Sequence, residues 1–160
     1  LASKYQEKIN KLILESTSFG IEDKDDRAVR FQEDLSLCNL IELDFHKFVQ
    51  KWERTSLFSN QSKRNQVQFK KQRKNRLSHN PAQLSKALKA FSQGHMRPYE
   101  AEFLKFNFPI SIINGSNDFK YKLIGKRMSK INKQAIQHVV NNANHNVHLE
   151  STDAFINLIK

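Results

Sequence analysis

The sequence predicts an α/β fold in which parallel strands are flanked by helices and a long helical segment is inserted between the first two strands. Short apolar runs at residues 11–17, 108–114 and 135–140 suit buried strands. Helical patterns separate these runs, and strands that alternate with helices favour a parallel sheet with right-handed crossovers. The stretch between the first two runs is too long for a crossover, which indicates a helical insertion over one edge of the sheet.

The insertion contains several helical patterns. Residues 21–52 begin with clustered carboxylates, which favour the positive end of a helix dipole, and continue with apolar residues three or four apart. We therefore expect one or two amphipathic helices there. The basic stretch 65–76 predicts a surface helix, and Asn80 followed by Pro81 marks another helix start. The predicted apolar stripe of this last helix is Leu84, Ala87, Leu88 and Phe91.

Two further helices are predicted after the second strand. A helix over 119–130 follows a Gly-Ser-Asn-Asp turn, and a terminal helix follows the polar turn 141–146. The expected apolar members of the first helix are Tyr121, Leu123, Ile124 and Met128. Residues 1–8 have no capping box ahead of them and resemble the last turns of a helix.

Composition excludes several classes of protein. The 160 residues are 38% hydrophobic and 10% aromatic, which is enough for a packed core. No apolar run approaches the ~18 residues of a membrane helix, and no signal peptide is visible. The single cysteine, Cys38, excludes an internal disulfide and a cysteine-type zinc cage. A lone thiol suits a reducing compartment, so we expect a cytoplasmic protein.

The positive charge is concentrated in one block. The net charge is +11, and no acidic residue lies between Glu53 and Glu100. The basic residues of the block are Arg54, Lys63, Arg64, Lys70, Lys71, Arg73, Lys74, Arg76, Lys86, Lys89 and Arg97. Such a block suits nucleic acid, a small polycarboxylate substrate, or simply a solvated helical face. No stacking aromatics interleave its most basic run, and no zinc-finger, RNP or G-x-x-G pattern accompanies it, so nucleic acid is not favoured.

Two polar residues follow successive predicted strands and could carry chemistry. Asp118 follows the second strand and His145 follows the third. Adjacent parallel strands end at one edge, so the carboxylate is expected to meet one imidazole nitrogen and fix its tautomer, while the other nitrogen serves as a general base. Asp118 could instead bond its own backbone, and His148 could replace His145 or cap the final helix. His46, His79 and His95 lack a carboxylate at ligand spacing, so no metal site is predicted.

The order of these residues resembles that of the α/β-hydrolases, whose triad runs Ser, then Asp or Glu, then His along the chain. Residues 108–118 resemble the strand and loop that deliver the acid, and residues 143–150 resemble the loop that delivers the histidine. The resemblance extends to the menaquinone-pathway MenH (SHCHC) synthase family. The motifs that carry it are Leu14-Glu15-Ser16-Thr17-Ser18-Phe19-Gly20, Arg27-Ala28-Val29-Arg30, Phe48…Trp52…Leu57-Phe58, Gln72-Arg73…Arg76-Leu77-Ser78 and Asn146-Val147-His148-Leu149-Glu150.

This resemblance implies a lyase that is similar in kind to esterases. Members of the family eliminate pyruvate from a succinylated cyclohexene carboxylate and use no metal or organic cofactor. By resemblance, Asp118 orients His145, and His145 activates the serine of the triad. The residues that match substrate-binding positions are Arg30, Trp52, Phe58, Arg76 and Lys120. Guanidinium forks suit the carboxylates of such a substrate.

Simpler roles remain open for some of these residues. Trp52 and Phe58 could be ordinary core aromatics, and Arg30 could pair with Asp26 four residues before it on a helix. One position departs from the family pattern. The residue before the histidine is usually glycine, and here it is Asn144, the next-best residue for a left-handed conformation.

The resemblance also predicts which part of the fold is present. The nucleophile motif G-x-S-x-G does not occur in the sequence. We therefore expect the C-terminal portion of an α/β-hydrolase fold, with residues 1–20 and 100–160 forming the core and 21–99 an all-helical cap. We expect this chain to be inactive alone. Its unpaired sheet edge should make it self-associate or require the N-terminal part of the fold.

Two other functions stay open from the sequence. A different α/β-hydrolase, such as an esterase, would share the triad and differ in the contacts that Arg30 and Arg76 make to substrate. A non-enzymatic module would use the basic block to bind nucleic acid or an acidic protein, with a steep salt dependence. The favoured partner is a small anionic substrate, and no membrane partner is expected.

Overall fold

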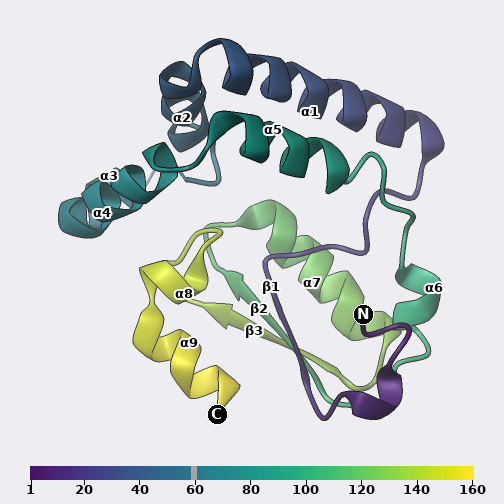
Figure 1. The fold of residues 1–160 in the computed structure, drawn as a ribbon. Helices are drawn as coiled ribbons and strands as arrows, with labels where there is room; N and C mark the ends of the chain where they lie inside the picture. The colour runs from purple at the N-terminus through teal and green to yellow at the C-terminus, as the bar shows by residue number, and fades with distance from the viewer. Residues whose placement is uncertain (59–60) are drawn as a thin grey trace. The chain divides into compact units, whose positions relative to one another are not determined.

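The protein is described by a computed structural model of residues 1–58 and 61–160, without the side chains of residues 63 and 64 (Figure 1). The basic residues Lys63 and Arg64 therefore lie outside the described side chains. The chain divides into two compact units. The first combines Leu1–Phe19 with Tyr99–Lys160, and the second is Gly20–Pro98, the helical unit.

The first unit is built on a three-stranded parallel sheet. Its strands are β1 (Leu12–Glu15), β2 (Ile110–Gly115) and β3 (Ala135–Val140), in the order β1-β2-β3. The register places the first residues of the three strands opposite one another. The strands therefore run side by side in one direction, as Figure 1 shows. The predicted α/β class and its three parallel strands are confirmed.

The central strand β2 is completely buried. All of its residues are shielded from solvent, and its three isoleucines supply apolar side chains, as suits a buried parallel strand. Ile110 and Ile112 join a core that includes Met128. Ile113 joins a second cluster with Val147, against which the last helix packs. Apolar side chains therefore cover both faces of this strand.

Helices flank the sheet within the first unit. They are α6 (Glu100–Phe103), α7 (Phe119–Ile131), α8 (Val147–Glu150) and α9 (Thr152–Ile159), preceded by a short 3₁₀ turn, η1 (Gln6–Lys8). Helix α7 packs against β2 and β3. It begins at residue 119 after the predicted turn, and Asp118 is its N-cap residue.

The helical unit begins each of its longer helices with a polar cap. Its helices are α1 (Lys24–Leu43), α2 (Phe45–Glu53), α3 (Gln61–Arg64), α4 (Gln66–Leu77) and α5 (Pro81–Ala90). The side chains that cap α1, α2, α4 and α5 are Asp23, Asp44, Asn65 and Asn80. Helix α1 packs along α5, and Ile41, Phe48 and Val49 form the buried core. Within residues 1–58 and 61–160, no helix is long and apolar enough to cross a membrane.

A buried carboxylate ties α1 to the segment that follows α5. Asp34 is 1% exposed and accepts hydrogen bonds from Arg30 Nε at 3.0 Å and from Ser92 Oγ at 2.7 Å. Ser92 Oγ in turn accepts from the Gly94 amide at 3.0 Å. A Cβ on Gly94 would overlap the backbone of α1, which explains the glycine. The buried charge is tolerated because it is paired and hydrogen-bonded.

Some details of the sequence prediction are wrong. Residues 1–8 contain only the 3₁₀ turn and not the end of an α-helix. Phe91 is 80% exposed and Leu123 is 66% exposed, so neither joins the apolar face assigned to it. Spacing identifies one side of a helix but not how much of that side another element covers. The four-residue helices α3 and α6 were not predicted, because they are too short to show a period.

We expect Ile112→Ala to destabilise the first unit much more than Ile136→Ala. Ile112 is 0% exposed, so its truncation leaves a cavity and lowers the free energy of unfolding by about 2–5 kcal/mol. Ile136, in the neighbouring strand, is 62% exposed, and its truncation should cost less than ~1 kcal/mol. Urea unfolding followed by circular dichroism measures both. Equal losses in the two variants would contradict the assigned core.

Candidate active site

The side chains of Asp118 and His145 meet at the carboxyl edge of the sheet. Asp118 lies at the start of α7, just after β2, and His145 lies in the loop between β3 and α8. Asp118 Oδ2 is 2.7 Å from His145 Nδ1. The sequence predicts this contact from two strand ends, and the structure contains it.

Backbone packing brings the histidine loop across the end of β2. A Cβ on Gly115 would overlap the carbonyl oxygens of Ala143 and Asn144, so the loop can pass this close only over a glycine. The amide of Asn117 donates to Ala143 O at 3.0 Å, and the amide of Asn142 donates to Ser116 Oγ at 2.9 Å. These bonds hold the turn after β2 against the loop after β3.

The pair is shielded unevenly from solvent. The Asp118 side chain is 3% exposed and the His145 side chain is 18% exposed. Asp118 Oδ1 accepts a long hydrogen bond from the Tyr121 amide at 3.4 Å, and the Tyr121 ring centroid is 4.7 Å from that of His145. A buried carboxylate that accepts from Nδ1 keeps the proton on that nitrogen. The arrangement therefore suits Nε2 to act as a general base.

A second histidine–carboxylate pair lies in the same unit. His148 Nδ1 is 2.7 Å from Glu15 Oε2 and 3.0 Å from Glu15 Oε1, and the His148 amide donates to Oε1 at 2.9 Å. His148, which the sequence leaves as an alternative to His145, thus joins the end of β1 to α8. Glu15 was not predicted as a site residue. It lies inside the predicted strand 11–17, whereas the observed strand β1 ends at Glu15, at the same edge of the sheet as Asp118.

Asn144 supports the histidine loop in a way that the sequence does not predict. Its amide and its Nδ2 both donate to Glu150 Oε2, at 2.8 and 2.7 Å. The expected left-handed conformation at Asn144 is wrong, because among the described non-glycine residues only Ser16 and Asn142 have a positive φ. The left-handed residue of this loop therefore comes two positions earlier than expected.

Lys120 lies close in sequence to the acid and is exposed. Its Nζ is 5.6 Å from the centroid of the Tyr121 ring. The structure therefore places this predicted substrate-binding residue beside the aromatic ring that contacts His145.

Three of the predicted substrate-binding residues come together in the helical unit. The ring centroids of Trp52 and Phe58 are 5.4 Å apart, and the guanidinium carbon of Arg76 is 5.9 Å from the Phe58 centroid. Trp52 is half-buried and Phe58 is buried, so the alternative that they are core aromatics describes their packing well.

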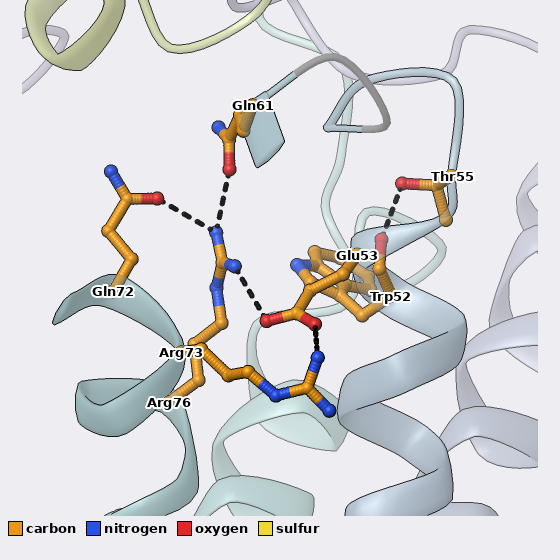
Figure 2. A network of polar contacts seen from close by, with 7 residues as sticks. All are labelled: Trp52, Glu53, Thr55, Gln61, Gln72, Arg73 and Arg76. Carbon is orange, nitrogen blue, oxygen red and sulfur yellow. Dashed lines mark hydrogen bonds and ion pairs between the residues drawn. The ribbon is translucent and has the colours of Figure 1, made fainter. Parts of the chain in front are cut away.

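Arg76 belongs to a polar network that the sequence did not reveal (Figure 2). Its Nη1 donates to Glu53 Oε1 at 3.1 Å, and Arg73 Nη1 donates to Glu53 Oε2 at 2.8 Å. Arg76 Nη2 donates to Gln61 Oε1 at 3.0 Å and to Gln72 Oε1 at 3.2 Å. Glu53 is the last acidic residue before the basic block. This position is the only feature of the sequence that could have indicated a role for Glu53.

Arg30 makes a different set of contacts. Its Nε donates to the buried Asp34 at 3.0 Å, and its Nη1 donates to Gln93 Oε1 at 3.3 Å. An ion pair four residues apart on a helix is therefore present, but Arg30 pairs with Asp34, four residues after it, and not with Asp26. The described contacts of Arg30 thus fasten α1 within the helical unit.

The structure offers no cluster of metal ligands in its described part. Among residues 1–58 and 61–160, no three histidine, cysteine, aspartate or glutamate side chains group closely enough to hold a metal ion. Cys38 is buried.

Comparison with known proteins identifies relatives of this chain and of its fold. No family model matches the chain. A protein of Bacillus subtilis (strain 168) with the provisional name 2-succinyl-6-hydroxy-2,4-cyclohexadiene-1-carboxylate synthase is 28% identical over 155 residues, which cover 96% of this chain and 57% of that protein. The structure of MenH from S. aureus matches with a TM-score of 0.92 at 28% identity, covering 99% of this chain and 61% of the other.

More distant structures share the fold alone. An esterase from Thermogutta terrifontis matches with a TM-score of 0.78 at 16% identity, covering 99% of this chain and 57% of the esterase. The chain therefore spans less than two thirds of the length of these proteins. It has part of an α/β-hydrolase fold and is related to MenH, the SHCHC synthase.

Proposed function

We propose that this chain is part of a MenH-like lyase that eliminates pyruvate from a succinyl-enolpyruvyl-hydroxycyclohexene carboxylate in menaquinone biosynthesis. The observation that carries the proposal is the Asp118–His145 contact, in a chain that is 28% identical to MenH from S. aureus over nearly its whole length. The proposed location is the cytoplasm, and no metal or organic cofactor is proposed.

In this mechanism the pair acts as an oriented base. Asp118 accepts a hydrogen bond from Nδ1 of His145, and Nε2 takes the proton from a serine. Residues 1–160 contain no G-x-S-x-G motif that would supply this serine. The serine oxygen, freed of its proton, removes a proton from the substrate ring, and the electrons of that C–H bond add a double bond to the ring as the carbon–oxygen bond to the enolpyruvyl group breaks. The protonated His145 Nε2 gives its proton to the departing oxygen, the enol becomes pyruvate, and the serine keeps the ring proton, so both catalytic groups are restored. Without its nucleophile, the 160-residue chain is proposed to be inactive by itself.

The substrate-binding role of five residues is carried over by resemblance. They are Arg30, Trp52, Phe58, Arg76 and Lys120. Contacts within the helical unit support Arg76 most directly, because its guanidinium lies beside Phe58 and two glutamine amides fix it in place. A planar guanidinium suits the carboxylates of a multiply anionic substrate. The role of residues 21–99 as a cap is part of the same proposal.

The test uses the native gene product, with all residues that flank Leu1–Lys160 in it. Pyruvate release from the cyclohexene substrate is followed by coupling to lactate dehydrogenase. The proposal expects pyruvate release that His145→Ala removes. Hydrolysis of p-nitrophenyl acetate without pyruvate release would favour the esterase alternative, and the absence of both activities would leave the basic block as the best guide to function.

Asp118→Asn should lower the rate of pyruvate release by about four orders of magnitude. The new amide can donate from its Nδ2 to Nδ1 of His145, which leaves the proton on Nε2 and removes the general base. The corresponding change in a Ser-His-Asp triad lowers kcat by ~10⁴. Asp153→Asn is the matched control, because Asp153 is an exposed aspartate at the start of α9. Steady-state kinetics of both variants check this. A rate for Asp118→Asn within tenfold of the parent would exclude Asp118 as the orienting acid.

The 160-residue chain alone should self-associate. Among the described strands, β1 and β3 each have a neighbour on one side only, so each presents an unpaired edge. Sedimentation velocity over a range of protein concentrations measures this. A strictly monomeric chain at all concentrations would show that its edges are protected in another way. Association that disappears when the native flanking residues are present would support the proposal.

A further inference from the structure

The loop that carries His145 is attached to two neighbouring strands. Two residues before His145, the Ala143 carbonyl oxygen accepts from the Asn117 amide at 3.0 Å, just after β2. Three residues after His145, His148 bonds to Glu15, the last residue of β1. The proposed base therefore lies between one attachment to β2 and one attachment to β1.

Glu15 holds His148 by both its backbone and its ring. Glu15 Oε1 accepts from the His148 amide at 2.9 Å, and Glu15 Oε2 lies 2.7 Å from His148 Nδ1. Because an ionised carboxylate only accepts hydrogen bonds, the proton of this contact is on Nδ1. The ring also packs edge to face on Phe155 of α9, with centroids 5.9 Å apart. These contacts fix both the position of His148 and the direction of its ring.

The amide contact also supplies a cap for α8. The N-cap residue is Asn146, and its side chain makes no capping bond to the described residues. The first amides of a helix have no partner within the helix. Glu15 accepts from one of them, which a side chain at the N-cap position usually does. Loss of this carboxylate therefore disturbs the start of α8, directly after the His145 loop.

The other printed contacts of this segment do not define its direction relative to β1. The Asn144 amide and Nδ2 both donate to Glu150 Oε2, so this bond closes the segment on itself. Val147 is buried in a cluster with Ile113 of β2. Apolar burial of this kind is not directional. The bonds to Glu15 are directional, so they determine how the segment is turned toward the end of β1.

We propose that Glu15 is a positioning residue, which holds His148 and thereby keeps His145 Nδ1 within hydrogen-bond distance of Asp118. The inference rests on the proposed function and deepens it, because it assigns a role to a residue outside the acid–base pair. A general base works only within hydrogen-bond reach of its partners, and a misplacement of ~1 Å can cost ~10²-fold in rate.

Solvent exposure separates the roles of the two histidine–carboxylate pairs. The side chains of His145 and Asp118 are 18% and 3% exposed, whereas those of His148 and Glu15 are 45% and 20% exposed. An acid orients a base more effectively where water is excluded, because the local dielectric is lower. Glu15 also accepts from a backbone amide, which Asp118 does not share with its histidine. The outer pair therefore suits attachment and the inner pair suits catalysis.

The test uses the native gene product and measures the release of pyruvate from the cyclohexene substrate. Glu15→Ala should lower kcat by about 10²-fold and change KM by less than about threefold, as expected when a catalytic group is misplaced. Glu15→Gln should recover most of the rate, because its Oε1 accepts from the His148 amide and its Nε2 can donate to Nδ1 of the other tautomer. His148→Ala keeps the amide donor and should lose less than Glu15→Ala.

Glu100→Ala is the matched control. The Glu100 side chain is 26% exposed and pairs with Arg127, 27 residues away, at 2.7 Å. This pair joins α6 to α7 and leaves the attachment of His148 intact. Its loss should therefore change kcat less than about twofold, as for an ordinary surface pair. Glu15→Ala combined with His148→Ala should be no slower than Glu15→Ala, because the two residues act through one contact.

A second readout does not depend on the reaction. A proton held between His145 Nδ1 and Asp118 gives a downfield signal in proton NMR. Glu15→Ala should weaken or remove this signal, whereas Glu15→Gln and Glu100→Ala should keep it. A protein that shows these changes but releases no pyruvate would contradict the lyase proposal and support the role of Glu15. The two proposals therefore fail separately.

Four results overturn the inference. They are an equal loss of kcat in Glu15→Ala and Glu100→Ala, a folded Glu15→Gln no faster than Glu15→Ala, and an Nδ1 signal that Glu15→Ala leaves unchanged. The fourth is a loss of activity in His148→Ala as complete as in His145→Ala, which would make His148 itself catalytic. Circular dichroism checks folding, and if Glu15→Ala does not fold, His148→Ala takes its place in the comparisons of rate and of the NMR signal.

Discussion

The candidate active site depends on a close approach between the end of β2 and the loop after β3. Gly115 lies so near the carbonyl oxygens of that loop that no Cβ fits between them. The missing side chain lets the loop cross the strand end, where the Asn117 amide holds Ala143 O. This path brings His145 Nδ1 to 2.7 Å from Asp118 Oδ2. The acid–base pair is therefore as much a product of backbone packing as of the two side chains that form it.

Buried carboxylates set the position of the important basic side chains in both units. Asp118 holds His145 in the first unit, and in the helical unit Asp34 holds Arg30 while Glu53 holds two arginines. All three carboxylates are buried, so each needs hydrogen-bond partners within the protein. The basic block thus contains two kinds of charge. Lys70, Lys71 and Lys74 are exposed, whereas Arg76 is ordered by a buried acid from outside the block.

The sequence predicted the fold and the acid–base pair because both follow from local patterns. Apolar runs located all three strands, and the rule that parallel strands end at one edge brought Asp118 to His145. The sequence could not predict the partners that depend on packing between distant segments. The contacts of Glu53 with Arg73 and Arg76 join α2 to α4, and those of Glu15 with His148 join β1 to α8. Neither pair has a fixed spacing that a pattern could reveal.

The carboxyl edge of the sheet also carries the unfavourable features of this unit. Ser16, just after β1, has a φ of 42°, and its buried Oγ has no hydrogen-bond partner among the described residues. Within the same described part, the buried Nδ2 of Asn114, near the end of β2, also has no partner. A buried polar atom without a partner costs about 1–3 kcal/mol, and backbone strain of this kind tends to gather at functional sites. Both features lie at the edge that presents Asp118 and His145, whereas the body of the sheet is regular and well packed. This placement supports a chemical role for the edge independently of the relationship to MenH.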